Sequence, residues 1–273
     1  QGLAGLQFLP YMDTLVERDN YTLNYATDNI DRPMSVLQHT LVFVNAWYGD
    51  STQVWPPPPH LDPIYVAVHT ESTEKTFARF DPGMQYMSNQ WPVGVRDKST
   101  HEYFGSHNVS NFISNCMTTT IVPMCSTRQN RKTMFVVDTG DEFLKDMVPA
   151  DIIEQTTKVT HKSMDQEVNS DPIARYLEAF KMLHRYACEA SLLITTRLHA
   201  ALPSAASGTP IVWIKHEDAL PGGGKASRVS DYYQFFHILE NMEDGKKMKW
   251  INPPMNPNID RREGMRNRLR VLA

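Results

Sequence analysis

The segment whose residue types point most directly to chemistry is a run of four consecutive residues, Thr196, Arg197, Leu198 and His199. It follows Ser191–Thr195, which we predict to be a short buried strand, and precedes small residues that we expect to form a helix. A helix N-terminus that follows a parallel strand favours anions, and an arginine there can hold a phosphate or carboxylate at two points. His199 can exchange a proton near neutral pH. The segment therefore predicts a small-anion site with an acid–base group, although an arginine paired with a surface carboxylate and a histidine capping a turn would give the same pattern.

A second group of polar residues follows two apolar runs in the first half of the chain. Arg96 ends the predicted strand Pro92–Val95 and is followed by Asp97, so it occupies the same topological position as Arg197, and we expect the two arginines to face one cleft. The alternative is a pair of neighbouring solvated charges on a loop. Three residues after the other run, Leu41–Val44, are further candidates for lining the opening: Asn45, Gly49 and Asp50. Their pattern is also typical of a turn.

Two other kinds of site are disfavoured. The segment Gly222–Lys225 resembles a phosphate-binding loop, but Ala219 stands where that motif needs glycine and Ala226 where it needs serine or threonine. The sequence contains neither Asp-x-Asp nor His-Glu-x-x-His. We therefore expect no metal in the chemistry of the anion site.

Composition narrows the classes of partner. Lysine and arginine total 27 against 31 aspartates and glutamates, so the net charge of −4 lacks the basic excess of a nucleic-acid-binding protein. The apolar runs are far shorter than the roughly 18 residues of a membrane span. The three cysteines, Cys116, Cys125 and Cys188, form no Cys-x-x-Cys pair, which argues against a zinc ribbon and allows at most one disulfide.

The elements that must position these residues alternate between strands and helices. In the first half, Leu41–Asn45, Tyr65–His69 and Pro92–Val95 are predicted strands, and the polar stretch Glu71–Phe80 is a predicted helix. In the second half, the predicted strands are Met134–Val137, Ser191–Thr195 and Ile211–Ile214, and the predicted helices are Pro172–Ala187 and Ala200–Ser207. This alternation predicts an α/β fold with parallel sheets and right-handed crossovers.

The length of 273 residues favours two domains at roughly 150 residues each. The polar, basic segment Cys125–Lys132 separates the two series of elements. We therefore predict an N-terminal domain of residues 1–127 and a C-terminal domain of residues 128–273, the second ending in a helical segment.

The stretch Leu192–Pro210, with Arg-Leu-His followed by small residues and then Gly-Thr-Pro, resembles the polysaccharide pyruvyl transferase family. Three further segments resemble that family in the expected order: Val44–Asp50 with the Trp-Pro-Pro and Val-Ala-Val-His that follow it, Pro92–Asp97, and Ser114–Thr120. The glycine-rich opening that many members carry is represented here only by Asn45 and Gly49-Asp50. Together these segments span most of the stretch from residue 41 to residue 234.

The resemblance implies a fold similar to that of GT-B glycosyltransferases, with two Rossmann-like domains around a cleft. It also implies transfer of pyruvate from phosphoenolpyruvate, the donor substrate, to a sugar of a glycan or polysaccharide, with a cyclic pyruvate ketal as product and no cofactor. By the same resemblance Arg197, His199 and Arg96 belong to the donor site. We assign His199 as the general acid, and the two arginines as the groups that hold the phosphate and stabilise it as it leaves.

Two other functions remain open, because a fold hosts many chemistries. One is a GT-B glycosyltransferase that uses a nucleotide-sugar donor, and the other is a carbohydrate-binding module without catalytic activity. The chain opens with Gln1 and has no basic-then-apolar leader. We accordingly expect a cytoplasmic location for a bacterial-type protein, and the Golgi lumen for a eukaryotic enzyme whose N-terminal anchor has been trimmed.

Overall fold

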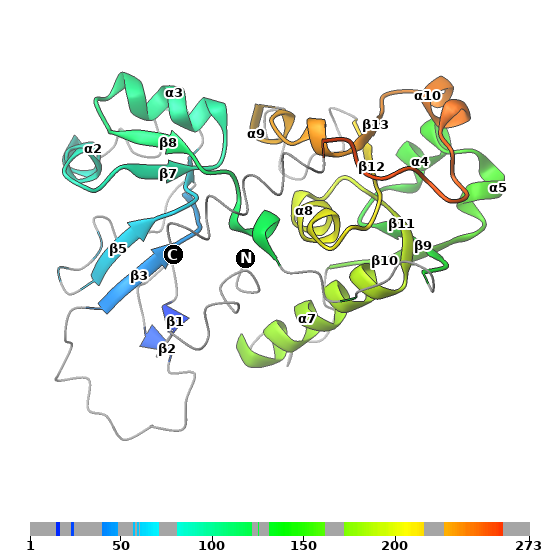
Figure 1. Cartoon of the computed structure of the whole chain (residues 1–273), viewed down its shortest axis with the longest axis horizontal. Coiled ribbons are helices and arrows are strands. Elements are labelled where there is room, and N and C mark those ends of the chain that lie inside the picture. The colour runs from blue at the N-terminus through cyan, green and yellow to red at the C-terminus, as the bar shows by residue number, and fades with distance from the viewer. Residues whose placement is uncertain are drawn as a thin grey trace. The chain divides into compact units, whose positions relative to one another are not determined.

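The computed structural model describes residues 15–16, 23–24, 40–48, 57, 59, 61–70, 81–121, 125, 131–161, 172–215 and 227–258. The chain divides into two compact units, which meet in the sequence between Met117 and Thr118 (Figure 1). The prediction from the sequence placed this boundary between residues 127 and 128. We call the residues up to Met117 unit 1 and those from Thr118 onward unit 2.

Unit 1 is built mainly from short parallel strand pairs. β3 (Thr40–Val44) pairs with β5 (Leu61–Tyr65), β4 (Trp47–Tyr48) with β6 (His69–Thr70), and β7 (Val93–Val95) with β8 (Asn111–Ile113). An isolated parallel bridge between Val68, which directly precedes β6, and Val95 connects this segment to β7. The unit also contains the antiparallel pair β1 (Leu15–Val16) and β2 (Leu23–Asn24), and the helices α2 (Asp81–Ser88) and α3 (Lys98–Ser106).

The predicted strand Tyr65–His69 is interrupted in the structure. β5 ends at Tyr65 because the amides of Val66 and Ala67 both donate to the carbonyl of Val44, so two residues oppose one, as in a β-bulge. Regular pairing resumes at His69. Gly94 of β7 faces this bulge, and a Cβ at that position would lie 2.5 Å from the carbonyl oxygen of Val66. The predicted helix Glu71–Phe80 lies outside the described residues.

Unit 2 contains a five-stranded sheet in the order β10-β9-β11-β12-β13, and every neighbouring pair is parallel. The strands are β9 (Thr133–Val137), β10 (Thr156–Val159), β11 (Ala190–Thr195), β12 (Ile211–Ile214) and β13 (His237–Leu239). The strands expected at residues 134–137, 191–195 and 211–214 are confirmed, and so is the α/β class with parallel sheets.

Helices cover both faces of this sheet, as a buried parallel sheet requires. Met134 and Val136 of β9 pack on one face with Leu144 of α4 (Asp141–Met147) and Ile152 of α5 (Ala150–Ile153). The alternate residue Phe135 points to the other face, where it contacts Tyr186 of α7 (Pro172–Cys188). α8 (Leu198–Ala206) packs beside α7 and against β11 and β12.

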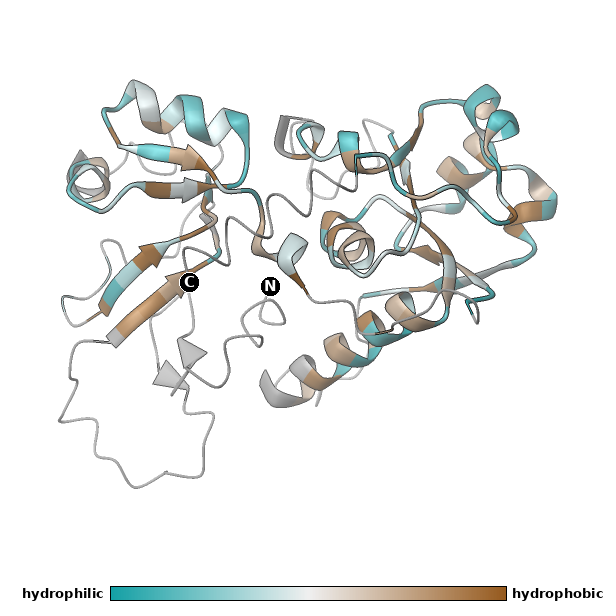
Figure 2. Cartoon of the chain, in the orientation of Figure 1, coloured by the Kyte–Doolittle hydropathy of each residue, from teal (hydrophilic) through white to brown (hydrophobic). Residues whose placement is uncertain are grey.

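The C-terminal part of unit 2 is less regular. α9 (Ser227–Ser230), the short 3₁₀ helix η5 (Tyr233–Phe235) and β13 lead to α10 (Met242–Lys247). The ribbon of α10 is coloured hydrophilic in Figure 2, in contrast to the apolar strands of the sheet. A further 3₁₀ helix, η2 (Met117–Thr120), begins at the boundary between the units. Within the described ranges, every helix is too short or too polar to cross a lipid bilayer.

The strand order places a topological switch point between β9 and β11. The chain passes from β9 to β10 on one side and then crosses to β11 on the other, so the crossover connections lie on opposite faces of the sheet. Open parallel sheets bind ligands at the carboxyl ends of the two strands where this reversal occurs. In unit 2 these ends are the residues that follow Val137 and Thr195.

Candidate functional site

Asp138 occupies the carboxyl end of β9 at the switch point. Its backbone has a φ of 47°, a left-handed conformation that aspartate tolerates better than most side chains. The carboxylate is almost fully buried, at 7% exposure, and accepts hydrogen bonds from Thr160 Oγ1 at 2.7 Å and from the amide of His161. These two residues follow β10, so Asp138 joins the ends of the neighbouring strands.

Arg197 approaches the same carboxylate from the end of β11. Its Nε lies 3.1 Å from Asp138 Oδ2, and the side chain keeps 32% of its surface exposed. Its amide donates to Thr195 Oγ1, and that hydroxyl in turn donates to the carbonyl of Val137. Within the described part of the chain, the contacts of this guanidinium involve Nε, which leaves Nη1 and Nη2 available for a ligand.

Arg197 is also the N-cap residue of α8, and its side chain makes no capping hydrogen bond to that helix. The first turn therefore presents the positive end of the helix dipole beside a guanidinium held by Asp138. His199, in this first turn, is exposed. Leu198 and Thr196 are buried, and Thr196 Oγ1 donates to the carbonyl of Asp138. The four-residue segment thus forms the strand-to-helix turn that was predicted.

A histidine–tyrosine pair completes the cluster. His161 Nε2 lies 3.0 Å from the hydroxyl of Tyr186, and the two rings are stacked. Loss of water around the imidazole lowers the pKa of His161, although the residue keeps exposed surface. The negative charge of Asp138 opposes this effect and raises the pKa, whereas the positive charges of Arg197 and His199 lower the pKa further. Burial raises the pKa of Tyr186, so its hydroxyl stays protonated and can donate to Nε2 of a neutral His161.

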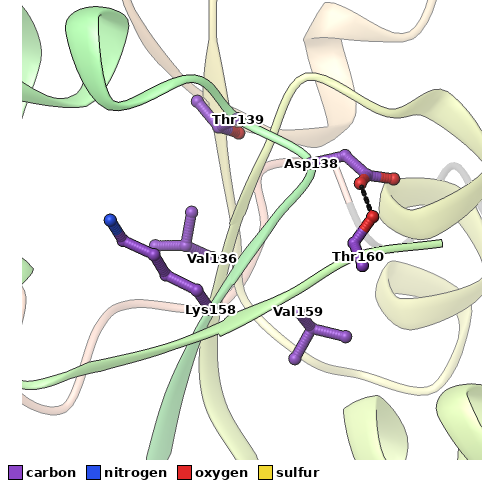
Figure 3. Close-up of a pocket in the computed structure, with 6 residues that line it drawn as sticks. All are labelled: Val136, Asp138, Thr139, Lys158, Val159 and Thr160. Atoms are coloured by element: carbon purple, nitrogen blue, oxygen red, sulfur yellow. Dashed lines mark hydrogen bonds between the residues drawn. The ribbon is translucent and has the colours of Figure 1, made fainter. Parts of the chain in front are cut away.

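An open hollow of about 260 Å³ lies beside Asp138 between the ends of β9 and β10. Figure 3 shows the residues that line it, which are Val136, Asp138, Thr139, Lys158, Val159 and Thr160. Lys158 pairs with Asp141 of the first turn of α4. The space suits a small polar molecule or one end of a larger one, since drug-sized ligands occupy roughly 300–1,000 Å³.

The residues predicted in unit 1 have a different environment. Arg96 is buried at 4% exposure, and its Nε donates to the carbonyl of Ala67 at 2.9 Å. Asn45 is half-buried and accepts a weak hydrogen bond from Cys116 Sγ. Gly49 and Asp50 lie outside the described residues. The expectation that Arg96 and Arg197 face one cleft stays a prediction, because each unit is described by itself.

Asp97, which follows Arg96, forms a buried network in unit 1. Its carboxylate caps α3 by accepting from the amide of Thr100, and its other oxygen lies 2.6 Å from His69 Nδ1. Burial alone would raise the pKa of Asp97, but the hydrogen bond and charge of His69, together with the bonds from Thr100 and Ser99, hold that pKa below its ordinary value. Asp97 is therefore not the solvated charge that the alternative reading supposed.

Asp138, Thr160, His161 and Tyr186 were not among the residues predicted from the sequence. The rule that singled out Arg197, a polar residue directly after a buried strand, applies equally to Asp138 after β9. Thr160 and His161 follow the mostly polar segment Thr156–Val159, which has no strand signal. Tyr186 joins the cluster through tertiary packing alone.

Comparison of the chain with protein-family models, with curated proteins and with solved structures finds no match.

Proposed function

We propose that the protein transfers the pyruvyl group of phosphoenolpyruvate to two hydroxyls of a sugar in a glycan, forming a cyclic ketal. The observation that carries this proposal is the strand-to-helix turn of unit 2: Arg197, paired with Asp138, stands at the N-terminus of α8, and His199 lies two residues further on. The similarity of this segment to the polysaccharide pyruvyl transferase family supports the same reading.

The reaction needs a cationic phosphate site and a proton donor. A proton adds to the methylene carbon of the enol, one sugar oxygen attacks the resulting cationic carbon, and the second oxygen closes the ring as the carbon–oxygen bond to phosphate breaks. Two hydroxyl protons leave the sugar; one balances the proton that became part of the methyl group, and the other leaves on inorganic phosphate. No external oxidant or reductant takes part.

The described residues can supply these functions. Among the described residues no partner occupies Nη1 or Nη2 of Arg197, so these groups can hold the phosphate or carboxylate at two points, and the dipole of α8 adds to the attraction. Asp138 orients the guanidinium. His199, exposed beside it, is the general acid of the proposal, which contributes roughly 10²–10⁴ in rate. The lowered pKa of His161 makes this residue the weaker candidate for the general acid.

The proposal includes a second arginine and a two-domain cleft. Two Rossmann-like domains in a GT-B-like arrangement would bring Arg96 of unit 1 opposite Arg197, so that the two anionic ends of phosphoenolpyruvate each meet a guanidinium. Support for this part comes from the parallel strands of both units and from the position of Arg96 directly after β7.

Glycosyl transfer from a nucleotide sugar is the second candidate, because a helix N-terminus at a switch point also suits a diphosphate. Thermal unfolding with each donor distinguishes the two. At a concentration 100 times its Kd, a ligand that binds only the folded state adds about 2.7 kcal/mol of stability. We expect phosphoenolpyruvate to raise the melting temperature and nucleoside diphosphates to leave it unchanged. The reverse pattern would favour the glycosyltransferase.

A further inference from the structure

A cluster of two cysteines and a histidine lies in unit 2, apart from the anion site. Cys188 is the last residue of α7 and forms a disulfide with Cys125, with the two Cα atoms 5.5 Å apart. His184 stands four residues before Cys188 on the same helix. The two sulfur atoms and a ring nitrogen of His184 all lie within 4.8 Å of one another.

We propose that these three residues form a zinc site when the disulfide is reduced. Residues four apart on a helix share one face, a spacing that zinc-binding helices use. Two thiolates and an imidazole are ligands that zinc prefers, and a set of three leaves the fourth tetrahedral position for water or another ligand. Because His184 is exposed, that fourth position would be accessible from solvent.

The charges and protons balance in this exchange. Reduction adds two electrons and two protons to the disulfide, and a phosphine or dithiol reductant supplies the electrons. Zn²⁺ then displaces both thiol protons, and neutral His184 contributes a lone pair. Two thiolates cancel the charge of the ion, which limits the cost of holding it in a half-buried place. The disulfide and the metal site therefore exclude each other.

The position of the cluster separates it from the proposed reaction. Cys188 lies two residues before the first residue of β11, whereas Asp138 and Arg197 stand at the carboxyl ends of β9 and β11. Arg185, next to His184 on α7, is paired with Glu189, which offsets its positive charge near the site. Within the described part of the chain, the three residues make up the one group of histidine, cysteine and acidic side chains with metal-binding spacing.

The test is a titration of the full chain with Co²⁺, a spectroscopic substitute for Zn²⁺, at about pH 8, where an ordinary histidine has lost its proton. After reduction with a phosphine and removal of oxygen, we expect one equivalent of Co²⁺ to bind and to produce a thiolate-to-cobalt charge-transfer band. The oxidised chain should produce none. Zn²⁺ should abolish the band and raise the melting temperature of the reduced chain only.

Two variants make the assignment specific. His184→Gln keeps the disulfide intact, and it should weaken Co²⁺ binding to the reduced chain at least about tenfold, whereas His107→Gln in unit 1 should leave binding unchanged. Cys125→Ser should lose most of the band and weaken Co²⁺ binding at least about tenfold, because one of the two thiolates is gone. A band of wild-type intensity in this variant would overturn the proposal. The proposal is overturned if reduced wild-type chain shows no band, if the His184→Gln variant binds like wild type, or if the reduced chain is unfolded both with and without Zn²⁺.

Discussion

Replacing Arg197 with alanine should weaken binding of phosphoenolpyruvate about a hundredfold. Within the described part of the chain, the guanidinium contacts Asp138 through Nε. The NH₂ groups of Nη1 and Nη2 are therefore left for phosphoenolpyruvate, and we count one hydrogen bond from each. A hydrogen bond to a charged group contributes about 1.5–3 kcal/mol, which gives roughly 3–6 kcal/mol for two. The side chain is 32% exposed and partly neutralised by Asp138, so the lower end applies. About 2.8 kcal/mol corresponds to two factors of ten in Kd.

Calorimetric titration with phosphoenolpyruvate measures this loss directly. Lys246→Ala is the matched control, because it removes one positive charge from an exposed pair with Glu243 on α10. His199→Ala should bind the donor within a few-fold of wild type while losing roughly 10²–10⁴ in turnover, since a general acid acts mainly on the barrier. Wild-type affinity in Arg197→Ala would refute the donor site. Loss of binding in His199→Ala would make His199 a ligand contact instead.

Three further predictions concern stability. Asp97→Ala should lower the unfolding free energy, because it removes the hydrogen-bond partner of buried His69, which costs about 1–3 kcal/mol, and the cap of α3, which costs about 1 kcal/mol. Asp141→Ala at an exposed pair should change the unfolding free energy little in the same chemical denaturation, and equal effects of the two variants would contradict the assigned network. The lowered pKa of His161 means that the unfolded chain binds a proton at this residue more readily than the folded chain, so the contribution of His161 to the unfolding free energy is complete above about pH 6.5 and is lost as the pH falls. His161→Gln should therefore reduce the loss of unfolding free energy between about pH 7 and 5. An unchanged dependence of the unfolding free energy on pH would contradict the shift. Reducing the Cys125–Cys188 disulfide, which closes a separation of 63 residues, should lower the unfolding free energy by about 4 kcal/mol in metal-free buffer, and denaturation curves that coincide with and without reductant would count against it.

Three strands of unit 2, β9, β11 and β12, were predictable because their signal is local. Met134–Val137 and Ile211–Ile214 are continuous apolar runs, and such runs specify buried parallel strands without reference to the rest of the chain. The break after Tyr65 was not predictable, since it depends on two amides of one strand sharing a carbonyl of another. β10 was not predictable either, because its mostly polar sequence shows no run or alternation of apolar residues.

The candidate site was predictable in part for the same reason. Arg197 and its turn follow from a strand leading into a helix, which is a sequence feature. Its partner Asp138 follows β9, as Arg197 follows β11, but only the strand order shows that the carboxyl ends of β9 and β11 are adjacent. The contact between His161 and Tyr186 joins residues 25 positions apart and depends on how α7 packs against the sheet. The pairing of Cys125 with Cys188 was likewise one of three possibilities allowed by the sequence.

Mass spectrometry of glycosides incubated with the protein and phosphoenolpyruvate tests the central claim most directly. A panel of glycosides, each with a neighbouring or 1,3-related pair of free hydroxyls, would be compared with and without the donor, and with His199→Ala in place of wild type. The account predicts a product heavier by pyruvate less one water, accompanied by one equivalent of inorganic phosphate and absent with His199→Ala. A panel that gains no pyruvyl mass, but gains a glycosyl mass from a nucleotide sugar, would contradict it.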